Sequence, residues 1–303
     1  MSIAVVRPGM LTTVQDLGRQ GLQHLGVPAG GPMDWWSHEA ANRLVGNAPE
    51  AALLEVTLIG PELELLRNAT AAVTGANFEL SVSGRPVPMN QTFAVEAGDR
   101  LSFGRRVTGA RGYVAFDGGI DVPAVMGSRA THLKAALGGH QGRALRRHDT
   151  LPLGAGGRTS AGASSPVADP PHIPLPSPTA LRVIAGPEMP DAAIWQTVYT
   201  VSPQSDRMGY RLDGGAVQAS GDHVSSAVAM GTVQVTPSGT CVLLMADRAT
   251  SGGYARAATV ITADLPRAGQ LAPGDALRFV PVSFDEARAA LQQMRARLPG
   301  SAA

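Results

Sequence analysis

The segment from Gly9 to Asp34 holds the densest group of residues that could do chemistry. It places Asp16, Arg19 and Asp34 among glycines and next to a turn at Pro28. Glycine is used where the backbone turns with positive φ or approaches another group closely, and charged side chains on such turns suit the binding of a small polar molecule. A loop-rich β edge with structural salt bridges fits the same pattern, so spacing alone leaves both interpretations open.

A second candidate site spans residues 127–145. Its polar donors, beside a glycine turn, are Ser128, Arg129 and Thr131. A donor-rich loop of this kind suits a carboxylate, a phosphate or an amide oxygen. His132 and His140 have no carboxylate or cysteine near them in sequence, so we predict no metal site. A solvated loop capped by arginine side chains is the alternative.

Two further polar turns lie in the second half of the chain. Residues 202–212 contain Asp206 next to Arg207. Residues 245–260 follow an apolar run and contain, in order, Asp247, Arg248, Thr250 and Tyr254. Active sites are often built from loops at strand ends, so we expect this last cluster to face a ligand. Asp247 and Arg248 point to opposite faces of an extended strand, so we do not expect them to pair with each other.

The composition narrows the classes of function. A formal net charge of +1 gives no electrostatic reason to expect nucleic acid or an anionic membrane as a partner. The only lysine is Lys134 and no P-loop motif occurs, so there is little room for a phosphate-binding or carrier lysine. The only cysteine is Cys241, which excludes a disulfide within the chain. It is either a nucleophile or a small buried hydrophobe on a strand.

No targeting signal in the sequence points outside the cytoplasm. The N-terminus MSIAVVRPGM lacks the charged region and long apolar core of a signal peptide. No apolar run reaches the ~18 residues that a membrane span needs. A lone cysteine also favours a reducing compartment, so we expect a cytoplasmic protein.

The segments that must position these residues are predicted to be β-strands. Short apolar runs with period-two alternation, such as residues 91–104 and 232–247, are broken by Gly, Pro, Asn or Asp at intervals of roughly 8–12 residues. This pattern predicts an all-β protein built from sandwiches or barrels. Two helices are expected: one capped by Asp34 and ending at Gly46, and one that begins at a capping box of Ser283 and Glu286.

A stretch rich in Gly, Ala, Ser and Pro divides the chain. Residues 155–178 have almost no apolar periodicity and are typical of a linker or a long loop. We therefore predict an N-terminal β domain over residues 1–154. A C-terminal β domain, with a terminal helix, follows over residues 179–303.

Several of these motifs together resemble one known family. GMLTTVQDLGRQGLQHLGVPAGGPMD, then RGYVAFDGGIDVPAVMGSRATHLKAALGGHQGRAL and ADRATSGGYARAATVITADLPRAGQLAPGD, match it in order. The family is that of allophanate hydrolase subunit 2, also called biotin-dependent carboxyltransferase-like, and one branch is the C subunit of bacterial 5-oxoprolinase. The chain looks most like that branch. The resemblance implies two cyclophilin-like β-barrel halves.

The resemblance also implies a function shared with partner proteins. In the 5-oxoprolinase branch, a subunit-1-type protein (the B subunit) and a third protein (the A subunit) join this chain, and the complex cleaves 5-oxo-L-proline to L-glutamate with ATP. The ATP is held by the complex, at a place that the resemblance does not specify. One alternative is the carboxyltransferase component of a biotin-dependent urea or amide carboxylase, which would need a separate biotin protein because no biotin is expected on this chain. Another is a non-catalytic regulatory partner of a subunit-1-type protein.

Site residues follow from the residues above and from the matching motifs. The expected catalytic residues are Asp16, Arg19, Asp247 and Arg248. The expected substrate-binding residues are Asp34, Asn47, Glu55, Ser128, Arg129, Thr131, Asp206, Arg207, Gln234, Thr250 and Tyr254. The chain departs from the family at Ala249, where glutamine is usual, and this puts the identity of the substrate in question.

Overall fold

The computed structural model describes residues 2–156, 170, 172–188, 192–218 and 224–300. Contacts divide the chain into two compact units, which are described separately. Unit 1 consists of residues 1–19, 30–173 and 296–303, and unit 2 of residues 20–29 and 174–295. The main boundary thus falls within the predicted linker, of which residues 157–169 and 171 lie outside the described part. A single division at the linker would place residues 20–29 in unit 1 and residues 296–303 in unit 2. The contacts instead group residues 20–29 with unit 2 and residues 296–303 with unit 1.

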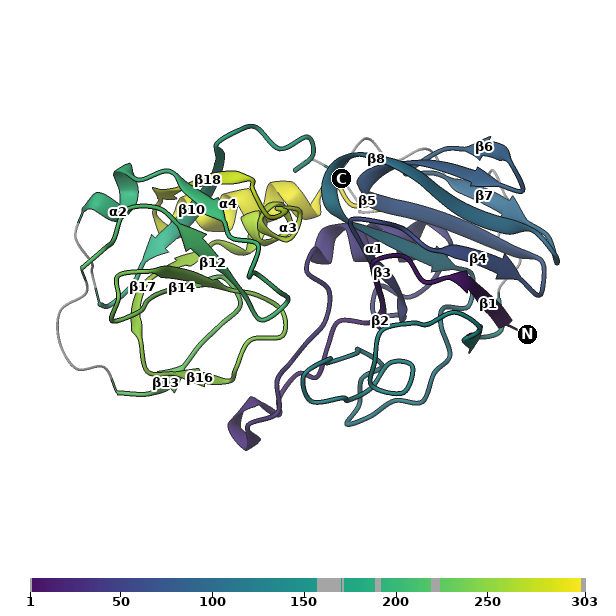
Figure 1. Ribbon diagram of the computed structural model, residues 1–303, viewed down its shortest axis with the longest axis horizontal. Helices are drawn as coiled ribbons and strands as arrows, with labels where there is room; N and C mark the ends of the chain where they lie inside the picture. The colour runs from purple at the N-terminus through teal and green to yellow at the C-terminus, as the bar shows by residue number, and fades with distance from the viewer. Residues whose placement is uncertain (1, 157–169, 171, 189–191, 219–223, 301–303) are drawn as a thin grey trace. The chain divides into compact units, whose positions relative to one another are not determined.

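Unit 1 is built on one curled sheet of nine strands (Figure 1). The strands are β1 (Ser2–Arg7), β2 (Leu11–Gln15), β3 (Leu53–Thr57), β4 (Glu62–Leu65), β5 (Ala69–Val82), β6 (Arg85–Val87), β7 (Thr92–Val95), β8 (Arg100–Phe116) and β9 (Thr150–Pro152). The hydrogen-bonded path runs β2-β3-β8-β4-β1-β9, and β5 pairs with β6, β7 and β8. The long β8 holds this sheet together because it pairs with β3, β4 and β5 along its length.

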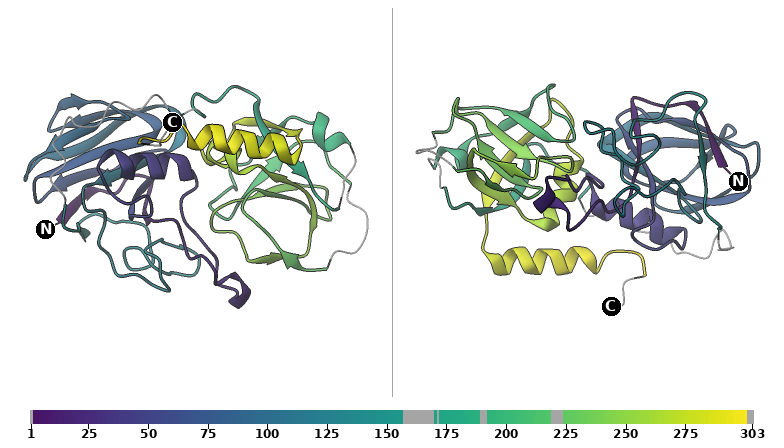
Figure 2. Two further views of the ribbon diagram at one scale, coloured as in Figure 1. Left: turned by 180° about the vertical axis from the view of Figure 1, so that it is seen from behind. Right: turned by 90° about the horizontal axis from the view of Figure 1, so that it is seen from below.

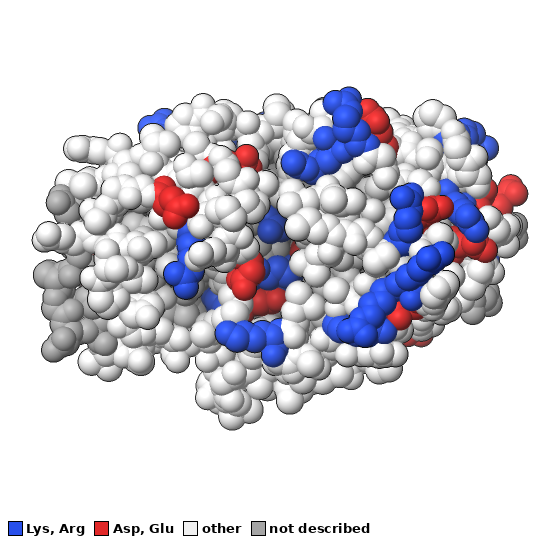
Figure 3. All heavy atoms as spheres, in the orientation of Figure 1, with Lys and Arg blue, Asp and Glu red and all other residues white. Residues whose placement is uncertain are grey.

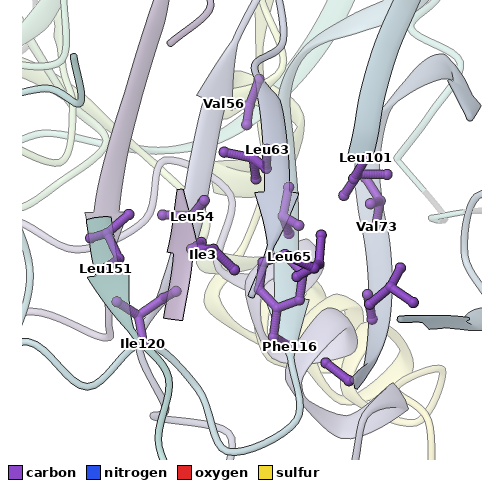
Figure 4. Close-up of a cluster of buried hydrophobic side chains, with 14 of the residues drawn as sticks. Ile3, Leu54, Val56, Leu63, Leu65, Val73, Leu101, Phe116, Ile120 and Leu151 are labelled. Atoms are coloured by element: carbon purple, nitrogen blue, oxygen red, sulfur yellow. The ribbon is translucent and has the colours of Figure 1, made fainter. Parts of the chain in front are cut away.

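The core of unit 1 lies on the inner face of this sheet. Figure 4 shows its side chains converging from separate strands, among them Ile3 of β1, Leu54 of β3, Leu63 of β4 and Val73 of β5. All four are fully buried. Burial of such side chains supplies the main favourable term in folding, and the period-two alternation of β4 and β7 places it on one face.

Helix α1 (Trp35–Leu44) covers part of the sheet of unit 1. Asp34 is its N-cap: the carboxylate accepts hydrogen bonds from the Ser37 backbone N–H at 2.9 Å and from Ser37 Oγ at 2.6 Å. Gly46 follows the helix with a φ of 75°, a conformation that suits glycine. The predicted helix is confirmed at both ends.

Unit 2 contains a closed barrel of seven strands with the order β10-β17-β14-β15-β12-β11-β18 (Figure 1). Its strands are β10 (Thr179–Ala185), β11 (Tyr199–Val201), β12 (Gly209–Asp213), β14 (Thr232–Val235), β15 (Cys241–Leu244), β17 (Ala255–Val260) and β18 (Ala276–Pro281). The barrel closes through the parallel pair β10–β18. A two-stranded ribbon, β13 (Ser226–Ala227) with β16 (Ser251–Gly252), lies outside the barrel path.

The helical segments of unit 2 are short except for the last. They are α2 (Ala193–Gln196), α3 (Leu265–Gly269), α4 (Phe284–Arg295) and the 3₁₀ turns η1 (Gln23–Leu25) and η2 (Thr262–Asp264). The predicted capping box of α4 is present, since Ser283 N and Oγ both donate to Glu286 Oε2 at 2.7 Å. Figure 2 shows α4 along the outside of this unit, where it contacts η2. Ala290 and Met294 form its buried stripe.

The prediction of an all-β protein with few helices is confirmed, with a difference between the two halves. The sheet of unit 2 closes into a barrel, whereas the sheet path of unit 1 ends at β2 and β9 and forms a curled half-barrel. Cys241 lies on β15 and is 1% exposed, and burial raises the pKa of its thiol. A buried thiol with a raised pKa is a poor nucleophile, so the structure favours the packing role.

Charged side chains on the visible face of unit 1 lie beside opposite charges (Figure 3). The ion pairs of unit 1 include Arg7–Glu62, Arg100–Glu64 and Arg105–Glu79. Surface pairs contribute little to stability but prevent a field of one sign. No helix in the described part of the chain is long and apolar enough to cross a membrane.

Candidate functional site

Asp16 organises a polar cluster in unit 1. It follows β2, and its carboxylate accepts hydrogen bonds from Gly18 N at 2.9 Å, Ser128 Oγ at 2.5 Å and Arg129 N at 2.5 Å. The structure therefore brings together two segments about 110 residues apart in sequence, both of which were predicted to be polar turns. Three donors on one carboxylate hold these two loops in a fixed register.

Arg19 is buried in the same region, at 1% exposed. Its guanidinium donates to the carbonyl oxygens of Val125 at 3.1 Å and Ala130 at 2.7 Å. Gly138 approaches so closely that a Cβ there would lie 2.0 Å from Arg19 Nη2. Arg19 therefore braces the 122–142 loop, and any catalytic role for it remains a prediction.

The other predicted residues of that loop have local partners. Thr131 donates through Oγ1 to Val14 O at 2.9 Å, and is fully buried. The Arg129 side chain donates to Val122 O at 2.7 Å and to Asp121 Oδ1 at 2.9 Å, and is 40% exposed. Both contacts stabilise the loop, and Arg129 is also open to solvent.

A second buried polar group surrounds the start of α1. Glu55 Oε2 accepts hydrogen bonds from Met33 N and from Tyr113 Oη, both at 2.8 Å, and Tyr113 Oη accepts one from Asp34 N at 2.8 Å. Burial, followed by the charges of Glu55 and Asp34, raises the pKa of Tyr113 well above its usual value, so it stays a neutral donor. Asp34 and Glu55 are thus joined through Tyr113.

His172 also belongs to this group, although no sequence signal marked it. Its Nε2 lies 2.7 Å from Asp34 Oδ2, with both side chains buried, and the edge of its ring contacts Trp36. Burial raises the pKa of Asp34, but the charge of His172 and hydrogen bonds from His172 and Ser37 outweigh this effect and lower it. The residue sits in the predicted linker, where no periodicity or motif indicates a buried position.

Asn47 has a structural environment. Its Nδ2 donates to Asn42 Oδ1 at 3.1 Å and to Phe116 O at 2.9 Å, and its Oδ1 accepts from Gly118 N at 2.9 Å. The carboxamide joins the segment after α1 to the end of β8. These contacts use both ends of the side chain, so any contact with substrate remains a prediction.

A cavity of about 460 Å³ is lined in part by the loop that Arg19 braces. The lining residues are Val122, Pro123, Val125, Ala136, Leu137, Gly138, Gly139, His140, Gln141, Gly142, Thr150 and Pro152. The lining is mostly apolar, and none of the predicted site residues belongs to it.

In unit 2, Arg207 and Asp247 form a buried ion pair. Nε of Arg207 lies 3.0 Å from Oδ2 of Asp247 and Nη2 lies 3.1 Å from Oδ1, with side chains 5% and 3% exposed. The backbone adds Asp247 N to Arg207 O at 2.8 Å. Asp206, next in sequence, accepts from Met208 N at 2.7 Å and shapes the turn that presents Arg207. The pair clamps this turn to the end of β15.

Arg248 does not pair with Asp247, as expected, but the reason is a turn and not the alternation of strand faces, because β15 ends at Leu244. Its Nε donates to Val228 O at 3.2 Å. Among the described residues, no carboxylate lies within ion-pair distance of its guanidinium. Partial burial lowers its pKa, but an arginine remains charged at neutral pH. Arg248 is therefore a cation with free donor capacity at the base of the ribbon β13–β16.

Gln234 lies beneath the same ribbon. On β14 its neighbours Val233 and Val235 are buried apolar residues, and side-chain alternation along the strand places Gln234 on the opposite face. It is nevertheless 5% exposed, because Gly252 of the ribbon covers it. Its Nε2 is buried and has no hydrogen-bond partner in the described part of the chain.

Thr250 and Tyr254 lie at the edges of this ribbon. Thr250 O accepts a hydrogen bond from Val228 N at 3.2 Å, and Tyr254 is 48% exposed. The exposed Ala249 lies between Arg248 and Thr250 and offers no polar side chain at this edge. The structure thus places Gln234, Arg248, Thr250 and Gly252 around one ribbon. We call this group the ribbon site.

The geometry separates two kinds of site. The clusters of Asp16 and Asp34 in unit 1 and the Arg207–Asp247 pair in unit 2 bind other parts of the chain, whereas Gln234 and Arg248 retain donors for an oxygen ligand. In the residues that the structure describes, no group of three His, Cys, Asp or Glu side chains could hold a metal ion. These observations define a mostly β protein with one open and one closed barrel-like unit and with hydrogen-bond donors beside a ribbon of the closed one.

The comparison with family models makes this class specific. The chain belongs to the family of the carboxyltransferase domain, subdomain A and B, whose model matches residues 25–281. This confirms the resemblance seen in the motifs.

Individual relatives agree with this family. The chain is 37% identical to the 5-oxoprolinase C subunit of Escherichia coli K12 over 301 residues, which cover 97% of this chain and 95% of that protein. It is 34% identical over 315 residues to the urea amidolyase of Lachancea kluyveri, of which it covers 17%. The crystal structure of TTHA0988 superposes with a TM-score of 0.84 at 36% identity, over 92% of this chain and 55% of that one. The chain therefore spans nearly all of this 5-oxoprolinase protein, about half of TTHA0988 and less than a fifth of the urea amidolyase.

Proposed function

We propose that this chain is the C-type subunit of an ATP-dependent 5-oxoprolinase, which opens 5-oxo-L-proline to L-glutamate together with partner subunits. The observation that carries the proposal is the donor pair of the ribbon site. Arg248 has a backbone carbonyl as its hydrogen-bond partner and Gln234 Nε2 has none among the described residues. Similarity to a 5-oxoprolinase C subunit over 95% of its length supports the same function.

The donor pair suits the chemistry of ring opening. Cleavage of an amide requires that its carbonyl be polarised and that an anionic group be held near it, and oriented donors in a partly buried site stabilise the charge that develops. Arg248 offers a guanidinium to a carboxylate or phosphoryl oxygen. Arg207 and Asp247 fix the turn from which Arg248 projects, so in this proposal they position Arg248.

The proposal includes partners and a nucleotide. A subunit-1-type protein of the B type and a third protein of the A type complete the complex, in the cytoplasm, and no biotin is attached to this chain. ATP is held by the complex, and its hydrolysis supplies the free energy for opening the ring. The donors of the ribbon site fit an anionic oxygen, which is compatible with substrate carboxylate or phosphate.

A second function has its own support. The family model is that of a carboxyltransferase domain, and the urea amidolyase of Lachancea kluyveri is 34% identical over 94% of this chain. This chain could then transfer a carboxyl group from a separate biotin protein to urea or another amide. Both functions require polarisation of an amide carbonyl, so the ribbon site serves either.

One experiment separates these functions. The chain is co-expressed with its A-type and B-type partners, and glutamate formation from 5-oxo-L-proline is measured with and without ATP. ATP-dependent glutamate formation that requires all the chains supports the proposal. Biotin-dependent carboxylation of urea supports the second function, and a stable complex that turns over neither substrate supports a regulatory role and contradicts the proposal.

Arg248 provides the residue-level test. We expect Arg248→Ala to lower kcat/KM by roughly 100-fold, the loss that follows removal of a charged hydrogen-bond partner of the substrate, while the complex still assembles. Arg248→Lys keeps the charge but loses the forked donors, so we expect an intermediate rate. Arg278→Ala, at an exposed position on β18 of the same barrel, is the matched control and should have normal activity. Full activity in Arg248→Ala would refute the assignment.

A further inference from the structure

The nitrogen of the Gln234 carboxamide is buried without a hydrogen bond in the described structure. Most buried polar groups in proteins are paired, and an unpaired donor lowers stability. The barrel could avoid this penalty with an apolar residue at the same position. Retention of the amide therefore indicates a second use for its N–H groups.

The neighbouring strand β17 sets the surroundings of Gln234. The pairing of β14 with β17 shifts register between Val233 and Gln234, and the extra residue lies on β17, so the shift sets which residue of β17 lies opposite Gln234. Opposite Gln234 lies Arg256, whose guanidinium is occupied by Glu188 at 2.8 Å. The carboxamide of Gln234 is a neutral donor, and Glu188 already neutralises the Arg256 cation that lies opposite it on β17.

Gly252 is shaped to fit this amide. A Cβ at residue 252 would lie 2.5 Å from Gln234 Nε2 and 3.3 Å from its Cδ and Oε1. The closest atoms belong to the end of a flexible side chain, so the conflict is with the placement of the amide and not with the barrel. Glycine at this position lets the ribbon cover Gln234 without displacing it.

We propose that Gln234 Nε2 donates a hydrogen bond to the ring carbonyl oxygen of a cyclic amide while Arg248 binds the carboxylate of the same molecule. This inference rests on the proposed function and assigns its substrate class, a lactam carboxylic acid. A neutral amide donor suits a carbonyl, and a guanidinium suits a carboxylate. Since Nε2 is covered, the ribbon moves outward when the ligand enters. Its strands are only two residues long, so this opening breaks few hydrogen bonds and costs little free energy.

The first test is Gln234→Met, which keeps the length of the side chain and removes its donor. In the assembled complex we expect KM for 5-oxo-L-proline to rise roughly tenfold, the value of one hydrogen bond to a neutral group. The melting temperature of the chain should stay the same or rise, because a buried unpaired donor is gone. A residue with only a structural role would show the reverse: a lower melting temperature and an unchanged KM.

Gln15 is the matched control. It is also fully buried, but its Nε2 donates to Thr13 Oγ1 and to Thr131 O, both at 3.1 Å. Gln15→Met should therefore lower the melting temperature and leave KM unchanged.

A second variant tests the geometry of the ribbon. Gly252→Ala should fold, since only the movable end of Gln234 is in its way, but it displaces the amide and should raise KM as Gln234→Met does. The double variant should have a KM no higher than Gln234→Met alone, because both changes remove the same hydrogen bond. Multiplicative effects would contradict the proposal.

Direct binding separates failure of this inference from failure of the proposed function. Calorimetry on the assembled complex uses 5-oxo-L-proline, 2-pyrrolidinone, which lacks the carboxylate, and L-proline, which lacks the ring carbonyl. If the wild type binds 5-oxo-L-proline without turnover and Gln234→Met binds it roughly tenfold more weakly, the function fails and the inference stands. If the two bind 5-oxo-L-proline equally, or if L-proline binds the wild type as tightly, the inference is wrong whatever the turnover.

Discussion

The buried pair of Arg207 and Asp247 gives the sharpest test of what holds the ribbon site in place. The side chains are 5% and 3% exposed, and two nearly parallel contacts of 3.0 and 3.1 Å join them. In such a site, removal of one partner leaves a buried charge without compensation. We therefore expect Asp247→Asn and Arg207→Met each to lower the free energy of unfolding of unit 2 by about 3–5 kcal/mol.

The double variant Arg207→Met with Asp247→Leu should recover most of this loss. Replacement of a whole buried ion pair by apolar residues of similar size is often neutral, because the cost of dehydrating both charges disappears together with their attraction. The half-exposed pair of Arg256 and Glu188, 31% and 29% exposed, is the matched control in the same unit. Glu188→Gln should cost less than about 1 kcal/mol, as exposed pairs do.

Two assays measure this loss. Urea unfolding is followed by the fluorescence of Trp195, the tryptophan that unit 2 contributes, and calorimetry gives the melting temperature. A loss of about 3–5 kcal/mol corresponds to a fall of roughly 10 °C or more in the melting temperature of a unit of this size. If Asp247→Asn costs no more than Glu188→Gln and still abolishes turnover, the clamp argument is wrong. Asp247 then takes part in the chemistry, as the sequence pattern first predicted.

Two further predictions concern unit 1. Two hydrogen bonds from Arg143, one from the backbone N–H of Arg146 and the charge of His140 lower the pKa of Asp149 from 3.8 to about 2. The stability that Asp149 contributes should be complete above its unfolded value and disappear as pH falls from about 3.8 to about 2, whereas urea unfolding of Asp149→Asn should show no such step. Gly139→Ala should lower the melting temperature by the equivalent of about 1–3 kcal/mol, because φ is 52° and a Cβ would lie 1.9 Å from Thr131 Oγ1. Gly127→Ala, with φ of 78° and open space around its Cβ, is the control, and an equal loss there would contradict the steric argument.

Local signals in the sequence predicted the elements well. The capping residues Asp34 and Ser283 mark the starts of α1 and α4, because a cap depends on residues within one helical turn. The alternation of apolar residues likewise predicted strands. Which strands pair was not predictable: β8 has partners in β3, β4 and β5, and the barrel closes through β10 and β18, whose contacts join distant segments.

The same limit applies to the site. Composition marked Asp16 and Ser128 as residues of polar turns, but their hydrogen bond joins positions 112 residues apart, and no local rule predicts it. His172 carried no signal at all, since a short segment rich in proline and glycine predicts a loop whether or not one of its side chains is buried. Burial of Gln234 depends on a glycine in a separate ribbon, so it too becomes visible only once the chain is folded.

Polar residues of this chain can therefore be sorted by how their hydrogen-bonding capacity is used. Asp16 accepts three donors from its own chain, and Glu55 accepts two on one oxygen. Such groups gain stability by holding loops, and a substrate would have to compete with those contacts. In the described structure Arg248 makes one hydrogen bond and Gln234 Nε2 makes none, so a ligand can bind them without breaking the fold. This difference, and not the density of charged residues in the sequence, is why the chemistry is assigned to the ribbon site of unit 2 and not to the glycine-rich segment that first draws attention.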